Sequence, residues 1–416
     1  MVNLCRLLLS VTLIFSGFVK AIDPLGTQYK IQDYLGALSL GSLLPDWLTL
    51  ALSVMLAAIE FILGILLLFA IHRRVTSRLI LALMVVMTLV TLWIWIADPV
   101  SDCGCFGDAI VLTNGQTLLK NIVLLFAAVV VCLWPLHMMR FISKGNQWIV
   151  VNYTLLFIIA VSVYCLYDLP IFDFRPYHVG ADLRKGMEIP EGEAQPEFET
   201  TFILEKDGER REFTLENYPD STWTFIDSKS VMTREGYIPP IHDFMIEDVE
   251  SGDDLTDVIL SDEGYNFLLI SPYLEHANDS NFGSIDQIYE YCQDNDYGFY
   301  CLTSSGSDAI QRWCDLTGAE YPFCHTDGVT LKTIIRSNPG LLLLHDGKVV
   351  RKWSHNYLPD ASMLTDRLEK LEIGSMPTDS VARKLFRIFI WFALPLLVLT
   401  FADRLWAWTR WVRRRK

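Results

Sequence analysis

Two cysteines separated by one glycine, Cys103-Gly104-Cys105, are the residues of this chain best suited to chemistry. They lie in a short polar loop between two hydrophobic segments, each long enough to cross a membrane. Glycine lets the backbone bend so that the thiols approach each other, and the small ring of an i, i+2 disulfide is expected to be strained and oxidising. The pattern therefore predicts thiol redox exchange at a membrane surface, with Cys103 and Cys105 as the catalytic residues.

Two other interpretations of this pair stay open. Paired thiolates also bind Cu(I) or Zn, although no His or third Cys lies nearby in the sequence, so we predict no metal site. The pair can also be a static bridge that closes the loop. Asp102 and Asp108 would oppose thiolate formation unless the N-terminus of the next helix, near Leu118 or Lys120, offsets them.

The other seven cysteines are expected to be packing residues. Three lie in or beside apolar segments. The remaining four fall in or near predicted helices and strands, where buried thiols are favoured, with a Cys314–Cys324 or Cys301–Cys324 bridge as the alternative. The seven are Cys5, Cys132, Cys165, Cys292, Cys301, Cys314 and Cys324.

The hydrophobic pattern predicts a multi-pass membrane protein. The 416 residues are 51% hydrophobic, with a mean hydropathy of +0.30, and the apolar residues are concentrated in blocks. No small-x-small cleavage site follows the first block, so a retained helix is favoured over a cleaved signal peptide. We expect membrane spans at roughly 4–22, 46–71, 78–97, 118–139, 148–167 and 385–404.

Basic residues predict the orientation. Arg73, Arg74 and Arg78 follow the second span, Arg140 and Lys144 follow the fourth, and the tail 405–416 is basic. Six spans with a cytoplasmic N-terminus place all three groups on the cytoplasmic side. The cysteine loop and segment 169–384 then lie in the periplasm of a protein of the inner (cytoplasmic) membrane.

The large segment between the last two spans is strongly acidic. Residues 169–384 hold 40 acidic and 18 basic side chains, whereas phosphate binding needs basic stripes. We therefore exclude nucleic acid as a partner. The simpler interpretation of this acidic charge is that it keeps the segment soluble. The more specific alternative is that it attracts a cationic partner.

Two parts are predicted within this acidic segment. Residues 169–240 are β-rich: strands at 200–204 and 212–215 flank the turn pair Asp207-Gly208, and 223–227 adds a third. Residues 241–372 alternate strands (267–271, 299–303, 340–344, 348–353) with helices (284–293, 307–317). This order predicts a sheet that is parallel at first and ends in an antiparallel hairpin.

The second part resembles a thioredoxin-like domain of the TlpA/AhpC kind. Its Ser337-Asn338-Pro339-Gly340 matches the family's proline before the third strand, and the resemblance implies a cis Asn338-Pro339 bond. Where the family carries Cys-x-x-Cys at a helix N-terminus, residues 271–277 contain no cysteine. We interpret the domain as a redox-inactive, binding version.

The first 140 residues resemble the MauE branch of the DoxX-like membrane proteins, as found in Bacteroidetes. Residues 15–20, 60–64 and 102–107 carry the resemblance, and the last group is the most specific. It implies a four-helix bundle related in architecture to vitamin K epoxide reductase and to bacterial disulfide-forming enzymes, and a role in periplasmic thiol redox. Nothing in the sequence speaks to methylamine as a substrate.

One ionisable pair is expected inside the bundle. Glu60 lies about 18 Å from His72 along its helix and Lys20 about 21 Å from Arg6, at 1.5 Å per residue, so antiparallel neighbours would bring them to a similar depth. A buried ion pair that fixes helix register is the simpler interpretation. A proton relay or contact with a quinone head group is the functional alternative.

The sequence thus predicts a multi-domain protein. Its parts are a helical bundle (1–140), a fifth span (148–167), a β-rich segment (169–240), a thioredoxin-like domain (241–372), a linker (373–384), a sixth span (385–404) and a tail (405–416). The bundle would pass electrons between Cys103/Cys105 and a carrier such as a quinone, while the periplasmic domain recruits a client protein. The alternative is a non-enzymatic envelope scaffold or binding protein with a structural cysteine bridge.

Overall fold

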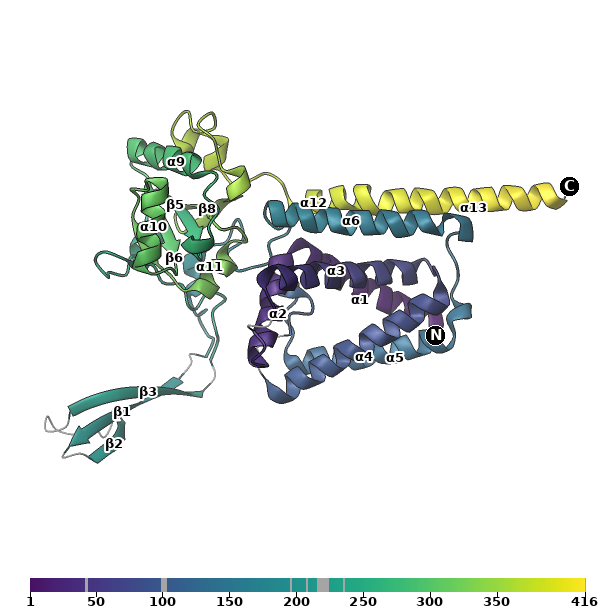
Figure 1. Cartoon of the computed structure of the whole chain (residues 1–416), viewed down its shortest axis with the longest axis horizontal. Coiled ribbons are helices and arrows are strands. Elements are labelled where there is room, and N and C mark those ends of the chain that lie inside the picture. The colour runs from purple at the N-terminus through teal and green to yellow at the C-terminus, as the bar shows by residue number, and fades with distance from the viewer. Residues whose placement is uncertain are drawn as a thin grey trace.

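A bundle of long helices and an α/β domain at one end of it make up the protein (Figure 1). The computed structural model describes residues 1–41, 44–98, 103–194, 197–206, 209–214, 224–234 and 236–415. The cysteine loop lies at the end of the bundle that faces the α/β domain, which we call the cysteine end. Arg73 and the C-terminus lie at the opposite end.

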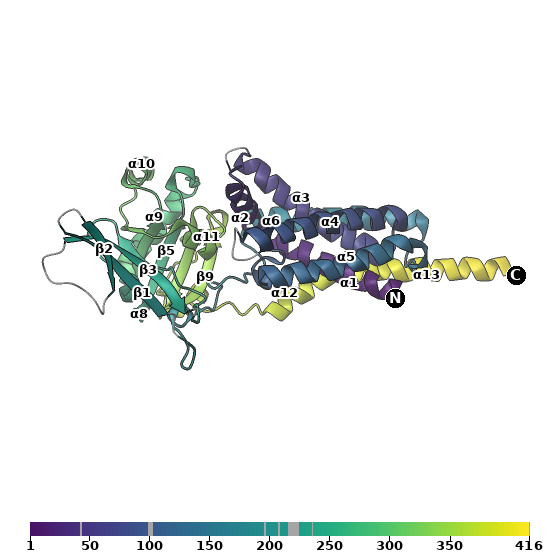
Figure 2. The ribbon, with the colours of Figure 1, turned by 90° about the horizontal axis from the view of Figure 1, so that it is seen from below.

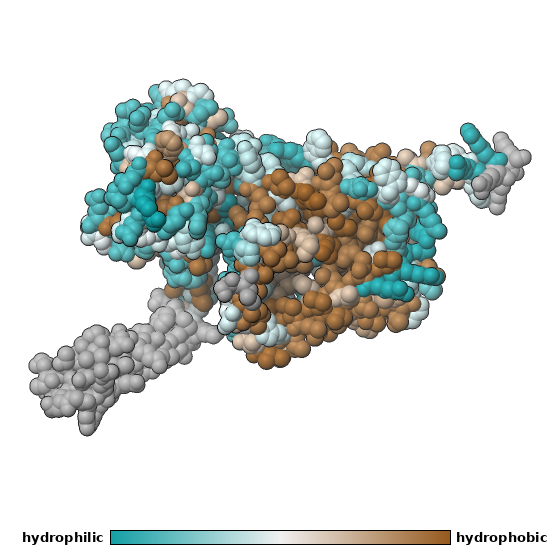
Figure 3. Space-filling model, in the orientation of Figure 1, coloured by the Kyte–Doolittle hydropathy of each residue, from teal (hydrophilic) through white to brown (hydrophobic). Residues whose placement is uncertain are grey.

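Six helices of the described residues are long and apolar enough to span a membrane, which confirms the multi-pass prediction. Mostly hydrophobic side chains cover the face of the bundle that Figure 3 shows. The last is continuous through a π-helical turn at Phe389–Ala393. The helices are α1 (Val2–Ile22), α3 (Asp46–Leu68), α4 (Arg73–Ala97), α5 (Asn114–Leu133), α6 (Gln147–Tyr167), and α12 (Val381–Ile388) with α13 (Leu394–Arg415).

The bundle consists of two tight helix pairs, α1 with α3 and α4 with α5, joined through α1 and α5. Glycine permits the close approach of the first pair. A Cβ atom at Gly17 of α1 would lie 2.7 Å from the carbonyl oxygen of Ala57 in α3. Helix α6 packs against α3 and α1, and the C-terminal helix runs beside α6 (Figure 1).

A further helix, α2 (Pro24–Ala37), was not predicted. Asp23 caps it, because its Oδ1 accepts a hydrogen bond from the Gly26 N–H at 2.9 Å, and Pro24 occupies the first turn, where a missing N–H costs nothing. This helix is too short to span a membrane and lies at the cysteine end of the bundle.

The α/β domain is built on a six-stranded sheet of order β4-β7-β6-β5-β8-β9. Strands β5, β6 and β7 are parallel, whereas β8 and β9 run antiparallel to their neighbours. Apolar residues fill both faces, so every residue of β5 is buried. The strands are β4 (Glu247–Asp248), β5 (Tyr265–Ser271), β6 (Gly298–Thr303), β7 (Phe323–His325), β8 (Gly340–His345) and β9 (Lys348–Ser354).

The predicted strand and helix order of this domain is confirmed, and Asn338-Pro339 is cis as expected. Helices α9 (Phe282–Asn295) and α10 (Ser307–Thr317) match the predicted ones. The short elements β4, β7, α8 (Thr256–Ser261) and α11 (Gly328–Ile334) were missed, as was α7 (Leu183–Met187) before the sheet. The domain's cysteines are free, as favoured over a bridge.

A separate three-stranded sheet projects from the α/β domain (Figure 1) and lies in front of that domain in the view of Figure 2. Strands β1 (Glu197–Lys206), β2 (Glu209–Thr214) and β3 (Thr224–Arg234) form it in the order β2-β1-β3. Lys206 pairs with Glu209, which confirms the predicted hairpin. Its predicted turn at 207–208 lies outside the described residues.

Candidate functional site

The two thiols of the cysteine loop touch each other. Cys103 Sγ and Cys105 Sγ are 3.0 Å apart and neither cysteine is in a disulfide. Gly104 between them has φ +60°, a left-handed conformation that glycine adopts without cost. The thiols need only close to about 2 Å to form a bond.

The polar sequence of the loop predicts exposed thiols, and this prediction is wrong. The exposed fractions of Cys103 and Cys105 are 9% and 7%. Helix α2 covers the loop: the Tyr34 hydroxyl donates to the Cys103 carbonyl oxygen at 2.5 Å. On the bundle side the two cysteines pack on Ile94 of α4, with Trp93 and Met87 beside it. The sulfur pair therefore faces apolar helix surface rather than water.

The two thiols differ in acidity. The hydrogen bond from Cys103 lowers the pKa of Cys105 to about 6 against the opposing effect of burial, with help from Lys120 and Lys20. The same hydrogen bond, together with burial, raises the pKa of Cys103 well above its ordinary value. The pair thus favours a thiolate at Cys105 and a thiol at Cys103, a division in which Cys105 is the better leaving group.

Lys20 and Glu60 lie directly below the loop and form an ion pair, as their predicted depths required. Lys20 Nζ is 2.7 Å from Glu60 Oε2, and both side chains are buried. Ser16 Oγ lies 2.7 Å from the same carboxylate oxygen and 2.8 Å from the carbonyl oxygen of Cys105. The pair therefore holds the cysteine loop through Ser16. That it contacts a carrier stays a prediction.

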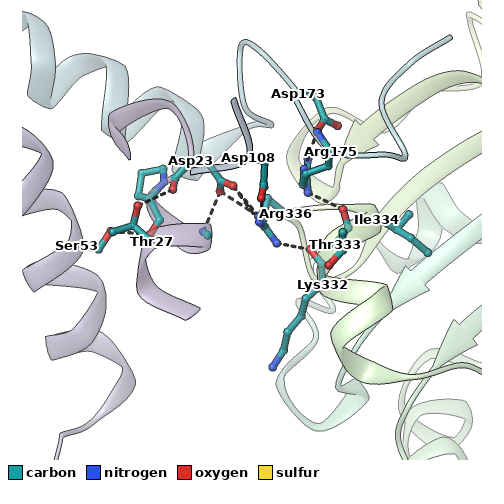
Figure 4. A network of polar contacts seen from close by, with 12 residues as sticks. Asp23, Thr27, Ser53, Asp108, Asp173, Arg175, Lys332, Thr333, Ile334 and Arg336 are labelled. Carbon is teal, nitrogen blue, oxygen red and sulfur yellow. Dashed lines mark hydrogen bonds and ion pairs between the residues drawn. The ribbon is translucent and has the colours of Figure 1, made fainter. Parts of the chain in front are cut away.

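A buried arginine of the α/β domain contacts the cysteine end. Arg336, just after α11, places Nη2 2.9 Å from Asp23 Oδ2, and its Nε lies 3.0 and 3.1 Å from the two carboxylate oxygens. Asp108, three residues past Cys105, is 3.8 Å from the same guanidinium. Figure 4 shows both carboxylates pointing toward Arg336.

A second polar contact ties the linker after α6 to the α/β domain. The Asp173 carboxylate accepts hydrogen bonds from Lys352 Nζ at 3.0 Å and from Arg175 Nε at 2.7 Å. Arg175 also donates to the Thr333 carbonyl oxygen at the end of α11. Both cations, Lys352 first, lower the pKa of Asp173 despite its burial. The domain is thereby fixed to the chain that leaves the membrane.

A cavity of about 260 Å³ lies where α2, the cysteine loop and α11 meet. Gly104 and Gly107 line it from the loop, and Lys332 and Arg336 from the α/β domain. The Lys332 ammonium lies over the rings of both Tyr29 and Tyr273, 5.1 and 4.8 Å from their centroids. The cavity is thus the open approach to the outer side of the loop.

The α/β domain turns its cysteine-free loop toward this contact. After β5 the chain forms a short turn at Leu274–His276, and Tyr273 there receives a hydrogen bond from Asn338 on its carbonyl oxygen at 2.8 Å. Lys332 Nζ lies 3.2 Å from the Tyr273 hydroxyl. Within the described part of the chain, no cluster of three His, Cys, Asp or Glu side chains is arranged to hold a metal.

A family model matches the helices that carry this site. The model of the methylamine utilisation protein MauE matches residues 1–134, which contain α1 to α5 and both thiols. Residues 1–134 are a MauE-family membrane region. A second model, a domain of unknown function (DUF8463), matches residues 198–235 in the projecting sheet.

Among solved structures, the chain is similar to a "putative protein disulfide isomerase" from Bacteroides thetaiotaomicron. The identity is 16%, the match covers 28% of this chain and 76% of that chain, and the TM-score is 0.23. No curated protein matches the chain.

Sequence reasoning identified the thiols, Lys20 and Glu60 but missed Tyr34, Asp23 and Arg336. The step from Asp23 to Pro24 is a helix-start signal that indicates α2, although it does not indicate that α2 packs over the loop. A single arginine between a short helix and a strand carries no comparable signal, because its partner is distant in the chain.

Proposed function

We propose that this protein is a membrane thiol oxidase module: it takes electrons from client thiols at Cys103/Cys105 and passes them to a membrane-soluble carrier of the quinone class. The observation that carries the proposal is the pair of touching thiols, of unequal acidity, packed on the apolar surface of α4. Met87 and Trp93, which are partly buried beside Ile94, mark the side from which we expect a hydrophobic carrier to approach. Residues 1–134, which hold both thiols, match the MauE family model, and the resemblance of these residues to that family implies a thiol redox role.

Each catalytic cycle moves two electrons from two client thiols to the cysteine pair and then to the carrier. A client thiolate attacks Cys103 of the oxidised pair, and Cys105 leaves as the thiolate because its pKa is the lower. A second client thiolate then displaces Cys103, which gives a client disulfide and the reduced pair. A bound quinone would accept the two electrons and two protons that Cys103 and Cys105 release as their disulfide re-forms.

Orientation in an inner membrane belongs to the same proposal. Arg73, Arg74, Arg140 and Lys144 lie at the end of the bundle opposite the cysteine loop, and cytoplasmic ends carry such residues. The cysteine end and the α/β domain would then lie in the periplasm, an oxidising compartment where client disulfides persist.

The proposal is tested with the full chain in lipid nanodiscs. A reduced dithiol peptide and a soluble quinone analogue are mixed with the protein, and peptide disulfide and hydroquinone are quantified. We expect one disulfide per hydroquinone, and no turnover when both Cys103 and Cys105 are replaced by Ser. A wild-type chain that supports neither product would instead favour a scaffold whose cysteines are structural.

A further inference from the structure

The contact of Arg336 with Asp23 and Asp108 joins three parts of the site at one guanidinium. Asp23 caps α2, the helix that covers the thiols, and Asp108 belongs to the cysteine loop itself. Arg336 comes from the α/β domain and is only 8% exposed. A cationic side chain is therefore seated between two carboxylates at the edge of the thiol site.

The two carboxylates favour a cation between them, while Lys30, Arg175 and Lys332 add positive charge to the lining of the adjoining cavity. Burial alone would raise the pKa of Asp23, but Arg336 and then Arg175 outweigh it and lower the pKa. Burial likewise opposes the charge of Arg336, yet Asp23 raises its pKa. Without a cation, the two carboxylates would be left half-buried beside each other, which is costly.

Helix α2, which covers the thiols, is linked to the carboxylates that hold Arg336. Tyr34 and Lys30, on the same face of α2, lie over the loop: Tyr34 binds the Cys103 carbonyl, and the Lys30 stem is 3.1 Å from the Cβ position of Gly104. Because Asp23 is the N-cap of this helix, Arg336 fixes the base of the cover. We expect a client thiol that approaches Cys103 past Tyr34 to displace α2 and so to disturb this contact.

We propose that the surface formed by Asp23, Asp108 and the adjoining cavity is the docking surface for the client protein, and that Arg336 occupies it as an intramolecular substitute. The partner that fits is a protein dithiol with a cationic side chain close to its cysteines. This inference rests on the proposed function, since it names the client of that site. The α/β domain then keeps the thiols covered until a client displaces Arg336.

The test measures access to the thiols rather than electron transfer. The full chain in nanodiscs is reduced and then treated with two methanethiosulfonates of similar size, one bearing a trimethylammonium group and one a sulfonate. Labelling of the peptide that contains Cys103 and Cys105 is followed by mass spectrometry. In the wild-type chain we expect slow labelling by both reagents.

Removal of the arginine should open the site and reveal its charge. In Arg336→Met we expect labelling at least about tenfold faster, since loss of one partner from a buried pair is strongly destabilising, with the cationic reagent ahead of the anionic one. Asp23→Asn, which keeps the helix cap, should also speed labelling but with less preference for the cation. Arg336→Lys, which keeps the charge, should stay nearer the wild type.

Arg312→Met, an exposed arginine of α10, is the matched control and should label at the wild-type rate. A melting curve of each variant shows that its α/β domain is folded. If folded Arg336→Met labels as slowly as the wild type, or if the anionic reagent is the faster one, the docking proposal is wrong. The proposed function would survive that result, because the peptide assay reads electron transfer independently of these rates.

Discussion

Arg336 and Asp23 form an ion pair of 2.9 Å across 313 positions of the chain. The pair connects the α/β domain to the junction of α1 and α2, and Asp108 extends it to the cysteine loop. The α/β domain has no thiol pair at its own Cys-x-x-Cys position. Through this ion pair, its position is coupled to the accessibility of the Cys103 and Cys105 thiols.

The Arg336–Asp23 contact should resist mild acid. The groups facing Asp23 are Arg336, Arg175, Asp108 and Tyr29, and the two arginines hold its pKa below the ordinary value against the effect of burial. A carboxylate with a depressed folded pKa contributes stability that is fully present above its unfolded pKa, about 3.9, and is lost as the pH falls through the folded value. Hydrogen exchange of α2, corrected for intrinsic rates, should therefore be unchanged from pH 7 to about 5. Loss of protection near pH 6 would contradict this assignment.

Cys105 should alkylate as a thiolate at neutral pH. Its pKa of about 6 arises from the hydrogen bond of Cys103, opposed by burial and Glu60 and supported by Lys120 and Lys20. The pH profile of iodoacetamide labelling, read on the Cys105 peptide, should have its midpoint near 6. Replacing Cys103 with Ala should move the midpoint upward, because the main stabilising hydrogen bond is lost. An identical midpoint in both chains would refute the coupling.

The Lys20–Glu60 pair should stabilise the bundle only as a pair. Glu60→Gln leaves a buried ammonium unpaired and should lower the free energy of unfolding in detergent by about 3–5 kcal/mol. The double variant Lys20→Met, Glu60→Leu should recover most of this loss. Glu263→Gln, at an exposed site of the α/β domain, should change stability by less than about 0.5 kcal/mol. Equal losses in the single and double variants would show that the ion pair itself is not the cause.

Gly104 should be required for thiol contact. Alanine there costs about 1–2 kcal/mol for the left-handed conformation, and its Cβ would press on the Lys30 stem at 3.1 Å. Gly104→Ala should therefore form the Cys103–Cys105 disulfide more slowly with diamide. Gly283→Ala, where a Cβ meets nothing within 4 Å, is the control. Unchanged oxidation in Gly104→Ala would mean that the loop tolerates another conformation.

Regular periodicity made most of the fold predictable. The apolar blocks gave the spans, and the alternating pattern after residue 241 gave β5, β6, β8 and β9. Short elements were missed because β7 and α11 contain too few residues for a periodic signal. The thiols and the Lys20–Glu60 pair followed from residue type and helix rise, since both depend on local spacing.

Burial of the thiols was not predictable in the same way. It depends on α2 and on Arg336, which meet the cysteine loop only through tertiary packing. The local sequence around Cys103 is polar and therefore indicated exposure. No local pattern reports that Tyr34 covers Cys103, or that Arg336, more than 200 residues away, holds the cap of the covering helix.

The redox state of Cys103 and Cys105 in native membranes tests the central claim most directly. Cells that express the chain are treated to keep the quinone pool reduced or oxidised, quenched with acid, and labelled so that thiols and disulfides differ in mass. We predict a Cys103–Cys105 disulfide when the pool is oxidised and two free thiols when it is reduced. A pair that remains in one state under both conditions would contradict electron transfer to the pool.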